Sequence, residues 1–158
     1  MVHLLRTTGS HADFQALVAL LDQDLAFRDG TEHTFYAAFN SSTSLQHVVV
    51  AYRQDQPIGC GAFKEFTPAL VEVKRMFVRT HSRGQGIAAK ILHELECWAQ
   101  ELHYPGGVLE TGKRQPEAIG LYQKSGYHFI PNYGPYVGIE NSVCLQKVWD
   151  TTPQAGGI

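Results

Sequence analysis

Three apolar runs separated by very short turns constrain the fold of this chain more than any other feature. The runs occupy residues 48–53, 58–66 and 70–78, and the residues between them include the turn formers Asp55 and Pro68. Turns of this length join antiparallel neighbours, because a parallel pair needs a crossover of about a dozen residues or more. The sequence therefore predicts an antiparallel three-stranded sheet in the middle of the chain.

Helical and strand patterns alternate on either side of this sheet. Apolar residues recur at helical spacing from Phe14 to Leu25, and we expect Ser10 to cap this helix, with Asp13 in its first turn. A shorter helix is expected at residues 31–39. The remaining expected elements are strands at 2–7, 108–111, 127–130 and 142–149 and helices at 87–102 and 116–124. Together they predict a mixed α/β sheet, antiparallel at first, with a right-handed crossover near its middle.

Glycines inside or beside these elements predict local features. Gly59 and Gly61 fall within an expected strand, which indicates a bulge or the close approach of another group. Gly106 and Gly107 are expected to end the preceding helix before the strand at 108–111. Gly126 suits the C-terminal cap of the helix at 116–124.

The chain is expected to form one domain. It has 158 residues, a suitable length for a single core, and no internal repeat or linker. We expect that domain to cover residues 1–150. The small and polar residues 151–158 are expected to form a frayed tail.

Composition and charge exclude several classes of function. Lys and Arg number 13 against 15 Asp and Glu, so no basic surface for nucleic acid or an anionic membrane is expected. No apolar run has the length of a signal-peptide core or a membrane span. Three widely spaced cysteines form neither a disulfide framework nor a zinc site. These features predict a cytoplasmic protein without a structural metal.

A glycine-rich loop between an expected strand and an expected helix is the most informative functional motif. It comprises Arg83, Gly84, Gln85, Gly86, Ile87, Ala88 and Ala89. The first amides of a helix have no internal partners and lie at the positive end of its dipole, so they form a site for phosphates. The loop alone also matches a dinucleotide fingerprint, with Glu110 as the ribose-binding acid, and it matches a turn that serves only packing. All three interpretations remain open at this point.

Two motifs together resemble the GNAT N-acetyltransferase superfamily. The first is Arg83-x-x-Gly86-x-Ala88, and the second runs from Ala118 through Tyr122 to Gly126 and Tyr127. The resemblance covers residues 48–149. It implies a GNAT-type fold, with helices on both faces of a mostly antiparallel sheet and one splayed pair of parallel strands. It also implies acetyl-CoA as cofactor and an acetyl transfer to a primary amine.

The resemblance assigns cofactor contacts to particular residues. The diphosphate of coenzyme A would lie on the amides of residues 83–89, and its pantetheine arm between residues 75–78 and 108–111. Amides of Met76, Phe77 and Val78 would bond the acetyl carbonyl and stabilise the oxyanion. Gln115 stands where the family often has an asparagine that bonds the pantetheine.

The same resemblance implies the acid and the base. Tyr122 would protonate the departing thiolate, and Glu72 would take the proton of the amine, directly or through water. Read without the resemblance, Tyr122 is a core aromatic of an amphipathic helix. Glu72 is equally well explained as an exposed charge that shares a strand face with Lys74.

The acceptor site is expected to involve two charged residues and two aromatic ones. Arg75 and Glu110 lie on the two central strands and could instead pair with each other. Tyr133 and Tyr136 lie in a loop that often shapes the family's substrate site. A mixed-charge pocket would suit a small polar amine better than a protein.

The cysteines and the remaining alternatives complete the sequence-based expectations. Cys60 and Cys144 lie on expected strands between apolar neighbours, and Cys97 lies on the expected helix at 87–102. No adjacent base is expected for any of them, which favours direct attack in a ternary complex over an acyl-enzyme. A non-catalytic acyl-CoA-binding regulatory module is the main alternative, and a nucleotide-binding protein is a weaker one. The family often forms homodimers, but the sequence carries no interface signature.

Overall fold

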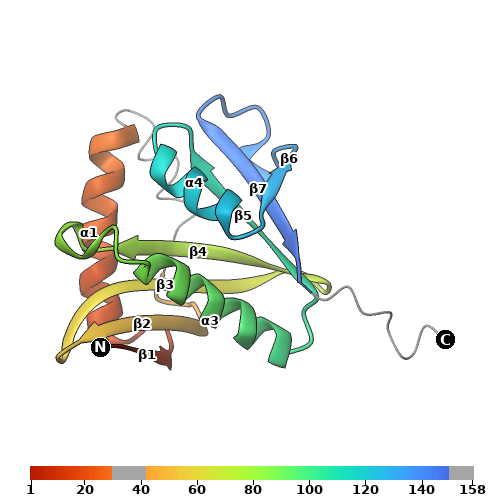
Figure 1. Cartoon of the computed structure of the whole chain (residues 1–158). Helices are drawn as coiled ribbons and strands as arrows, with labels where there is room; N and C mark the ends of the chain where they lie inside the picture. The colour runs from red at the N-terminus through yellow and green to blue at the C-terminus, as the bar shows by residue number, and fades with distance from the viewer. Residues whose placement is uncertain (30–41, 150–158) are drawn as a thin grey trace.

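A single sheet runs through the computed structural model of the chain, which describes residues 1–29 and 42–149 (Figure 1). Within these residues the sheet has seven strands in the order β1-β2-β3-β4-β5-β7-β6. The strands are β1 Val2–Thr7, β2 His47–Arg53, β3 Gln56–Thr67, β4 Leu70–Val78, β5 Gly106–Gly112, β6 His128–Ile130 and β7 Ser142–Val148. All neighbouring pairs are antiparallel except the parallel pair of β4 and β5. This confirms the mixed α/β fold and the antiparallel meander.

Three α-helices and two short 3₁₀ turns accompany the strands in the described ranges. They are α1 Ala12–Asp29, η2 Thr80–Ser82, α3 Ile87–Glu101, α4 Pro116–Lys124 and η3 Gly134–Tyr136. The expected cap of α1 was wrong by one residue. His11 precedes the helix, and its Nδ1 accepts a hydrogen bond from the Asp13 amide at 3.2 Å, whereas the Ser10 hydroxyl lies 3.0 Å from that of Thr8.

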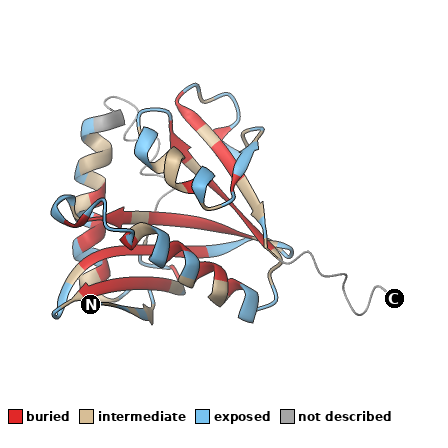
Figure 2. Ribbon diagram, in the orientation of Figure 1, coloured by how far each residue is buried: buried red, intermediate tan, exposed pale blue. Residues whose placement is uncertain are grey.

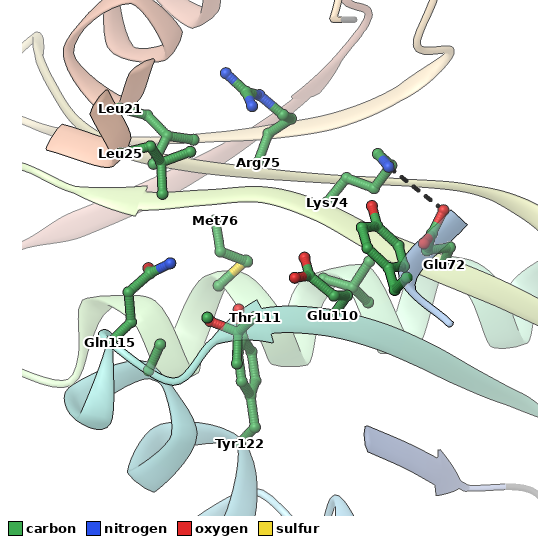
Figure 3. A pocket seen from close by; sticks show the side chains of 14 residues that line it. Leu21, Leu25, Glu72, Lys74, Arg75, Met76, Glu110, Thr111, Gln115 and Tyr122 are labelled. Carbon is green, nitrogen blue, oxygen red and sulfur yellow. Dashed lines mark hydrogen bonds and ion pairs between the residues drawn. The ribbon is translucent and has the colours of Figure 1, made fainter. Parts of the chain in front are cut away.

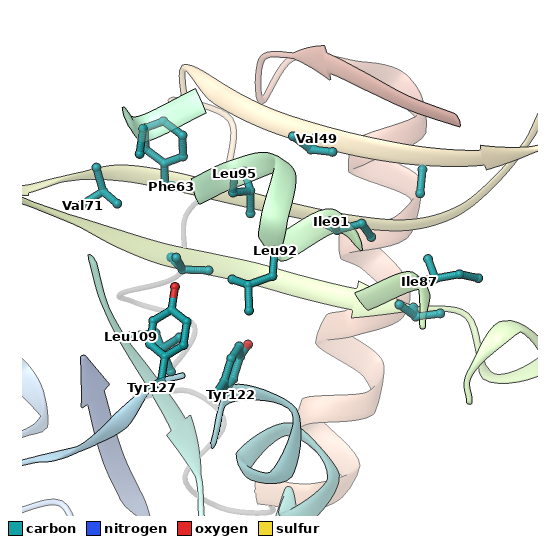
Figure 4. Close-up of a cluster of buried hydrophobic side chains, with 14 of the residues drawn as sticks. Val49, Phe63, Val71, Ile87, Ile91, Leu92, Leu95, Leu109, Tyr122 and Tyr127 are labelled. Atoms are coloured by element: carbon teal, nitrogen blue, oxygen red, sulfur yellow. The ribbon is translucent and has the colours of Figure 1, made fainter. Parts of the chain in front are cut away.

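Alternating side chains of the sheet form two separate cores. Val48 and Val50 point toward α1, where they pack with residues such as Phe14. Val49 and Ala51 belong to the opposite core, beneath α3 and α4. Figure 2 shows that burial is concentrated in the inner strands β2, β3 and β4, whereas the edge strands β1 and β6 are more exposed. Figure 4 shows side chains of α3 pointing into the second core, toward the sheet.

The glycines of the sheet mark close contacts. A Cβ added at Gly59 would lie 3.0 Å from Ile91 on α3, which confirms the expected close approach. Gly106 and Gly107 do not end a helix as expected; they lie inside β5. A Cβ at Gly106 would lie 2.7 Å from the Lys147 carbonyl oxygen, and one at Gly107 would lie 2.8 Å from the Trp149 ring. These contacts, invisible in the local sequence, are the reason for glycine there.

The parallel strands β4 and β5 pair over only part of their length. Their register runs from Leu70 opposite Gly106 to Val73 opposite Leu109. Beyond these residues the two strands diverge, as Figure 1 shows. The splayed pair is therefore confirmed, but the gap was predicted too early on β5, because residues 108 and 109 are still paired. The gap lies between residues 74–78 and 110–112.

Some sequence-based expectations lie outside the described residues. These are the whole of the short helix at residues 31–39 and the tail at 151–158. Within residues 1–29 and 42–149, no helix combines the length and apolar character needed to cross a membrane.

Candidate functional site

A large cleft opens where β4 and β5 diverge. It encloses about 610 Å³ and is bounded by the end of β4, the glycine loop, the first turn of α3, and α4, with part of α1. Of the residues predicted to bind cofactor, those that line it are Met76, Phe77, Val78, Arg83, Gly84, Gly86, Ile87, Ala88, Ala89, Gln115 and Tyr122. Gln85 is exposed and does not line the cleft. The predicted cofactor residues are thus brought together from four separate elements.

The glycine loop presents backbone amides to this cleft. Gly84 and Gly86 both have φ +78, and no atom lies within 4 Å of where their Cβ atoms would be. In the described chain, no backbone acceptor is recorded for the amides of residues 84–86, and the first amides of α3 are free as in any helix. Open amides at the positive end of a helix dipole fit a diphosphate.

Arg83 contributes differently from the expectation. Its amide donates to the Thr80 carbonyl at 3.3 Å, and its Nε donates to the Val78 carbonyl at 2.8 Å. Its guanidinium also lies 3.8 Å from the Asp24 carboxylate. Arg83 therefore fastens the loop to the end of β4 and to α1, and the loop amides available for a ligand begin at Gly84.

A bulge in β4 shapes the edge of the cleft. Cys60 faces Phe77 and Ala62 faces Lys74, so two residues of β4 stand opposite the single residue Gly61. Arg75, inside this bulge, has φ 58, an unusual value for a residue with a side chain. As a result, Lys74 and Arg75 both reach the α1 face of the sheet, although consecutive strand residues normally alternate. Arg75 there contacts Asp22 of α1.

A second, smaller pocket adjoins the cleft on this face (Figure 3). It encloses about 90 Å³, and most of the side chains around it are polar or charged. Glu72 and Lys74 on β4 lie across from Glu110 on β5. The residues that line both hollows are Leu21, Met76, Gln115, Ala118 and Tyr122. The two spaces therefore meet at Met76 and Tyr122.

Tyr122 points from α4 into this junction (Figure 3). Only 6% of its surface is exposed, and its hydroxyl has no hydrogen-bond partner among the described residues. Its ring makes an edge contact with Tyr127 at 5.9 Å. Burial, and to a lesser degree the charge of Glu110, raises the pKa of the Tyr122 phenol. The phenol therefore stays protonated at neutral pH, as a proton donor must.

Glu72 is buried rather than exposed, so its interpretation as a surface charge was wrong. It is 6% exposed, and its Oε2 accepts a hydrogen bond from the Tyr133 hydroxyl at 2.7 Å. Its Oε1 lies 3.5 Å from the Lys74 ammonium. A carboxylate held in this way at the wall of the small pocket can accept a proton from a group bound there.

The predicted acceptor residues are only partly brought together. Arg75, Glu110 and Tyr136 line the small pocket, whereas Tyr133 acts on Glu72 from outside it. Arg75 and Glu110 do not pair with each other. Arg75 donates to Asp22 at 2.6 Å, and Glu110 accepts from Ser142 at 2.8 Å.

Sequence reasoning missed several residues of the two hollows. Lys74 was noted only as a neighbour of Glu72, and Thr111 only as the last residue of the strand expected beside the pantetheine arm. Leu21 and Leu25 of α1 were interpreted as core residues of an amphipathic helix, yet both line the small pocket. Their helical spacing gave no signal that one end of the stripe reaches past the sheet into a cavity.

None of the three cysteines lines the large cleft or the small pocket. The Cys97 sulfur lies 3.5 Å from Nε2 of His93, so the expectation that no base adjoins a cysteine was wrong at this position. Burial raises the pKa of Cys60 to about 12 and that of Cys144 to about 11. Burial also raises the pKa of Cys97, and none of the three is paired in a disulfide. A thiol that keeps its proton is a poor nucleophile. Within the described chain, no group of three His, Cys, Asp or Glu side chains is arranged to hold a metal ion.

The fold and the site together define an acyl-CoA-dependent acyltransferase architecture, and comparison with known proteins identifies the family. Residues 44–129, more than half of the chain, match the Acetyltransferase (GNAT) domain. The chain belongs to this family of acetyltransferases.

Individual relatives agree with this assignment. An "IAA acetyltransferase" of Azospirillum brasilense is 38% identical over 100 residues, covering 63% of this chain and 65% of the relative, so the match spans just under two thirds of that protein. A solved Klebsiella pneumoniae protein, provisionally assigned as an acyl-CoA N-acyltransferase, is 27% identical with a TM-score of 0.77, covering 94% and 98% of the two chains. A GNAT acetyltransferase from Elizabethkingia anophelis, solved with acetyl-CoA bound, shares the fold at 18% identity and a TM-score of 0.66, covering 93% and 97%.

Proposed function

We propose that this protein transfers the acetyl group of acetyl-CoA to the primary amine of a small polar molecule, by direct attack in a ternary complex. The observation that carries the proposal is the junction of the two hollows at Met76 and Tyr122. A cofactor arm that enters through the large cleft would end there, facing the small pocket. The small pocket, at about 90 Å³, lies below the range of roughly 300–1,000 Å³ of sites for drug-sized ligands, which favours a compact acceptor.

Bound acetyl-CoA would supply an activated thioester carbonyl at this junction. The amides of residues 84–86 and of the first turn of α3 would bind its diphosphate. The edge of β4 beyond Val73 has no partner on β5, so its backbone groups could pair with the pantetheine arm. Gln115 lines both hollows and could donate to the same arm.

Tyr122 is proposed as the acid. Its hydroxyl lies at the junction without a competing partner, and its raised pKa keeps the proton on the phenol until the thiolate departs. Met76 to Val78 could contribute the amide that stabilises negative charge on the carbonyl oxygen.

Glu72 is proposed as the base. It faces the small pocket and could accept the ammonium proton directly or through water. The hydrogen bond from Tyr133 would hold its carboxylate in place. The high pKa values of Cys60 and Cys144 support direct attack by the amine over an acyl-enzyme.

An amine-panel assay tests the proposal. Release of free coenzyme A thiol from acetyl-CoA would be followed with small polar amines, with a no-amine control for hydrolysis. We expect turnover with at least one compact amine and no covalent acetyl on the protein by intact mass. Binding of acetyl-CoA without turnover of any amine would instead favour a regulatory module.

Replacing Glu72 tests the base separately. Glu72→Gln is expected to lower kcat/KM by about 10- to 100-fold near neutral pH and to change the rise of the pH–rate profile, because removal of a general base commonly costs about 10²-fold or more. Glu65→Gln, an exposed carboxylate on β3, is the matched control and should leave the profile unchanged. An unaltered profile in Glu72→Gln would exclude Glu72 as the base.

A further inference from the structure

The Lys74 ammonium is a buried cation with almost no fixed partner. The residue is 8% exposed, and within the described chain its one recorded contact is the Glu72 Oε1 atom at 3.5 Å. Good charge-assisted hydrogen bonds of this kind measure about 2.7–2.9 Å. An ammonium has three donors, so at least two of them have no acceptor among residues 1–29 and 42–149. Such an arrangement is unfavourable in an empty pocket and favourable once a ligand supplies acceptors.

The other charged side chains around the pocket are held in place by neighbouring residues. Glu72 accepts from Tyr133 at 2.7 Å, and Glu110 accepts from Ser142 at 2.8 Å. Arg75 donates through one terminal nitrogen to Asp22 at 2.6 Å, and its buried Nε has no partner in the described part of the chain. The two carboxylates suit the amine of an acceptor. The Lys74 donors that have no acceptor among the described residues suit a negatively charged group.

The β4 bulge explains why both cations stand on this face. In a regular strand Lys74 and Arg75 would point to opposite sides, but both contact partners on the α1 side. Burial lowers the pKa of Lys74, and the charges of Glu72 and Glu110 oppose this shift. A bound anion would add to the same opposition and stabilise the charged ammonium.

We propose that Lys74 binds a carboxylate on the acceptor, so that the substrates are compact amino acids rather than simple amines. This inference rests on the proposed acetyl transfer and names its acceptor class. The amine of the amino acid lies toward Glu72 and Glu110, and its carboxylate lies toward Lys74. The small volume of the pocket restricts the side chain to a few atoms.

Binding, measured apart from turnover, tests this inference. Protein saturated with coenzyme A would be titrated by calorimetry with N-acetylglycine, N-acetylalanine and N-acetylserine, each against its carboxamide. The acid of at least one pair should bind about 10- to 100-fold more tightly, the range expected for a hydrogen bond between charged groups. Lys74→Met should remove this preference, and Lys74→Arg should keep most of it.

Lys64→Met is the matched control for charge. Lys64 is exposed on β3, faces Glu72 in register, and does not line the pocket. It should retain the full preference. Thermal melting of each variant, with coenzyme A binding as a check of the cleft, would show that Lys74→Met is folded.

The outcomes separate the inference from the function on which it rests. Equal binding of acids and amides, no binding of any acid, or a preference that survives in Lys74→Met would each overturn the role of Lys74. A preference that disappears in Lys74→Met supports it. If that result occurs while free amino acids release no thiol from acetyl-CoA, the carboxylate site stands and the proposed transfer fails.

Discussion

The two halves of the β4–β5 pair differ although they belong to the same strands. In the paired half, Val71 and Val73 face Gly107 and Leu109 across regular parallel hydrogen bonds. Both valines and Leu109 are nearly fully buried in the α3-side core. In the parted half, mostly charged and polar residues line the small pocket, and mostly apolar residues line the large cleft. Backbone groups that the strands do not share become available to a ligand where the strands part, and Glu72 in the paired half faces the small pocket beside them.

The paired half belongs to a row of contacts that crosses the sheet. His47 faces Phe63, Phe63 faces Val73, Val73 faces Leu109, and Leu109 faces Leu145. The parted half begins one residue later, at Lys74. A row of paired, mostly apolar residues therefore joins the strands directly beside the segment in which β4 and β5 no longer pair. Variants on the two sides should therefore fail in different ways.

The largest effect is expected at the parted half, from Tyr122→Phe. Loss of the phenol proton should lower kcat about 100-fold or more, as for other general acids, while acetyl-CoA affinity stays nearly constant. Steady-state kinetics and calorimetry would measure the two effects. Tyr104→Phe removes a hydroxyl that bonds Glu65 outside both hollows and should keep full activity. Full turnover in Tyr122→Phe would remove Tyr122 from the mechanism.

A substitution in the paired half, Gly106→Ala, should lower the stability of the protein. The new Cβ would lie 2.7 Å from a backbone oxygen that cannot yield easily. Overpacking of this kind costs about 1–3 kcal/mol in the free energy of unfolding, measurable by urea titration. Gly120→Ala, in the middle of α4 with no atom within 4 Å, should instead stabilise the protein by about 0.5–1 kcal/mol. Equal stability of the two variants would contradict this picture of the paired half.

A substitution in the glycine loop, Gly86→Ala, should weaken the binding of coenzyme A. A side chain at φ +78 is strained by about 1–2 kcal/mol, so coenzyme A affinity should fall about 10-fold as the loop adjusts. Gly138 has a similar φ of +80 and open space, but it lies outside the cleft. Calorimetry should therefore show weaker binding in Gly86→Ala and normal binding in Gly138→Ala. Parallel losses in both would mean that the loop strain is not specific to the ligand site.

The smallest effect is expected for the pH dependence of stability, through His47 at the end of the row of paired residues. His47 stacks on Phe63 at 4.7 Å, and burial lowers its pKa in the folded state. The unfolded chain therefore takes up a proton near pH 6.5 that the folded chain resists, and stability should fall as the pH drops below that value. Urea titrations at pH 7 and pH 5.5 would measure the loss. His47→Gln should reduce it, and His128→Gln on the exposed surface should not.

Most of the fold followed from local patterns in the sequence. The bounds predicted for residues 2–7, 70–78 and 116–124 are those of β1, β4 and α4, because apolar period and turn residues agree there. Gly106 and Gly107 were misplaced because glycine locally resembles a break. Glycine is needed at these two positions of β5 because Lys147 and Trp149, some 40 positions away, leave no room for a Cβ.

The site was predicted less completely because it depends on contacts distant in sequence. The glycine loop and Tyr122 were found through motifs. The pairing of Arg75 with Asp22, 53 residues apart, follows from the bulge in β4. The burial of Lys74 depends on Leu21 and Leu25 of α1, which line the same pocket. That bulge places a positive φ on arginine, a residue type that gives no such signal.

Two glycines of β3, Gly59 and Gly61, determine how closely α3 packs on the sheet. Because Gly59 and Gly61 have no Cβ, the side chains of Ile91 and Leu95 on α3 can pack directly against the backbone of β3. A Cβ at Gly61 would lie 2.9 Å from Ile91 and 3.0 Å from Leu95. The same helix begins with the open amides that we propose as the site for the diphosphate. The spacing between α3 and β3 would then set the distance between that site and the junction at Met76 and Tyr122. A larger residue at either glycine would increase the distance between α3 and β3 without contacting the ligand.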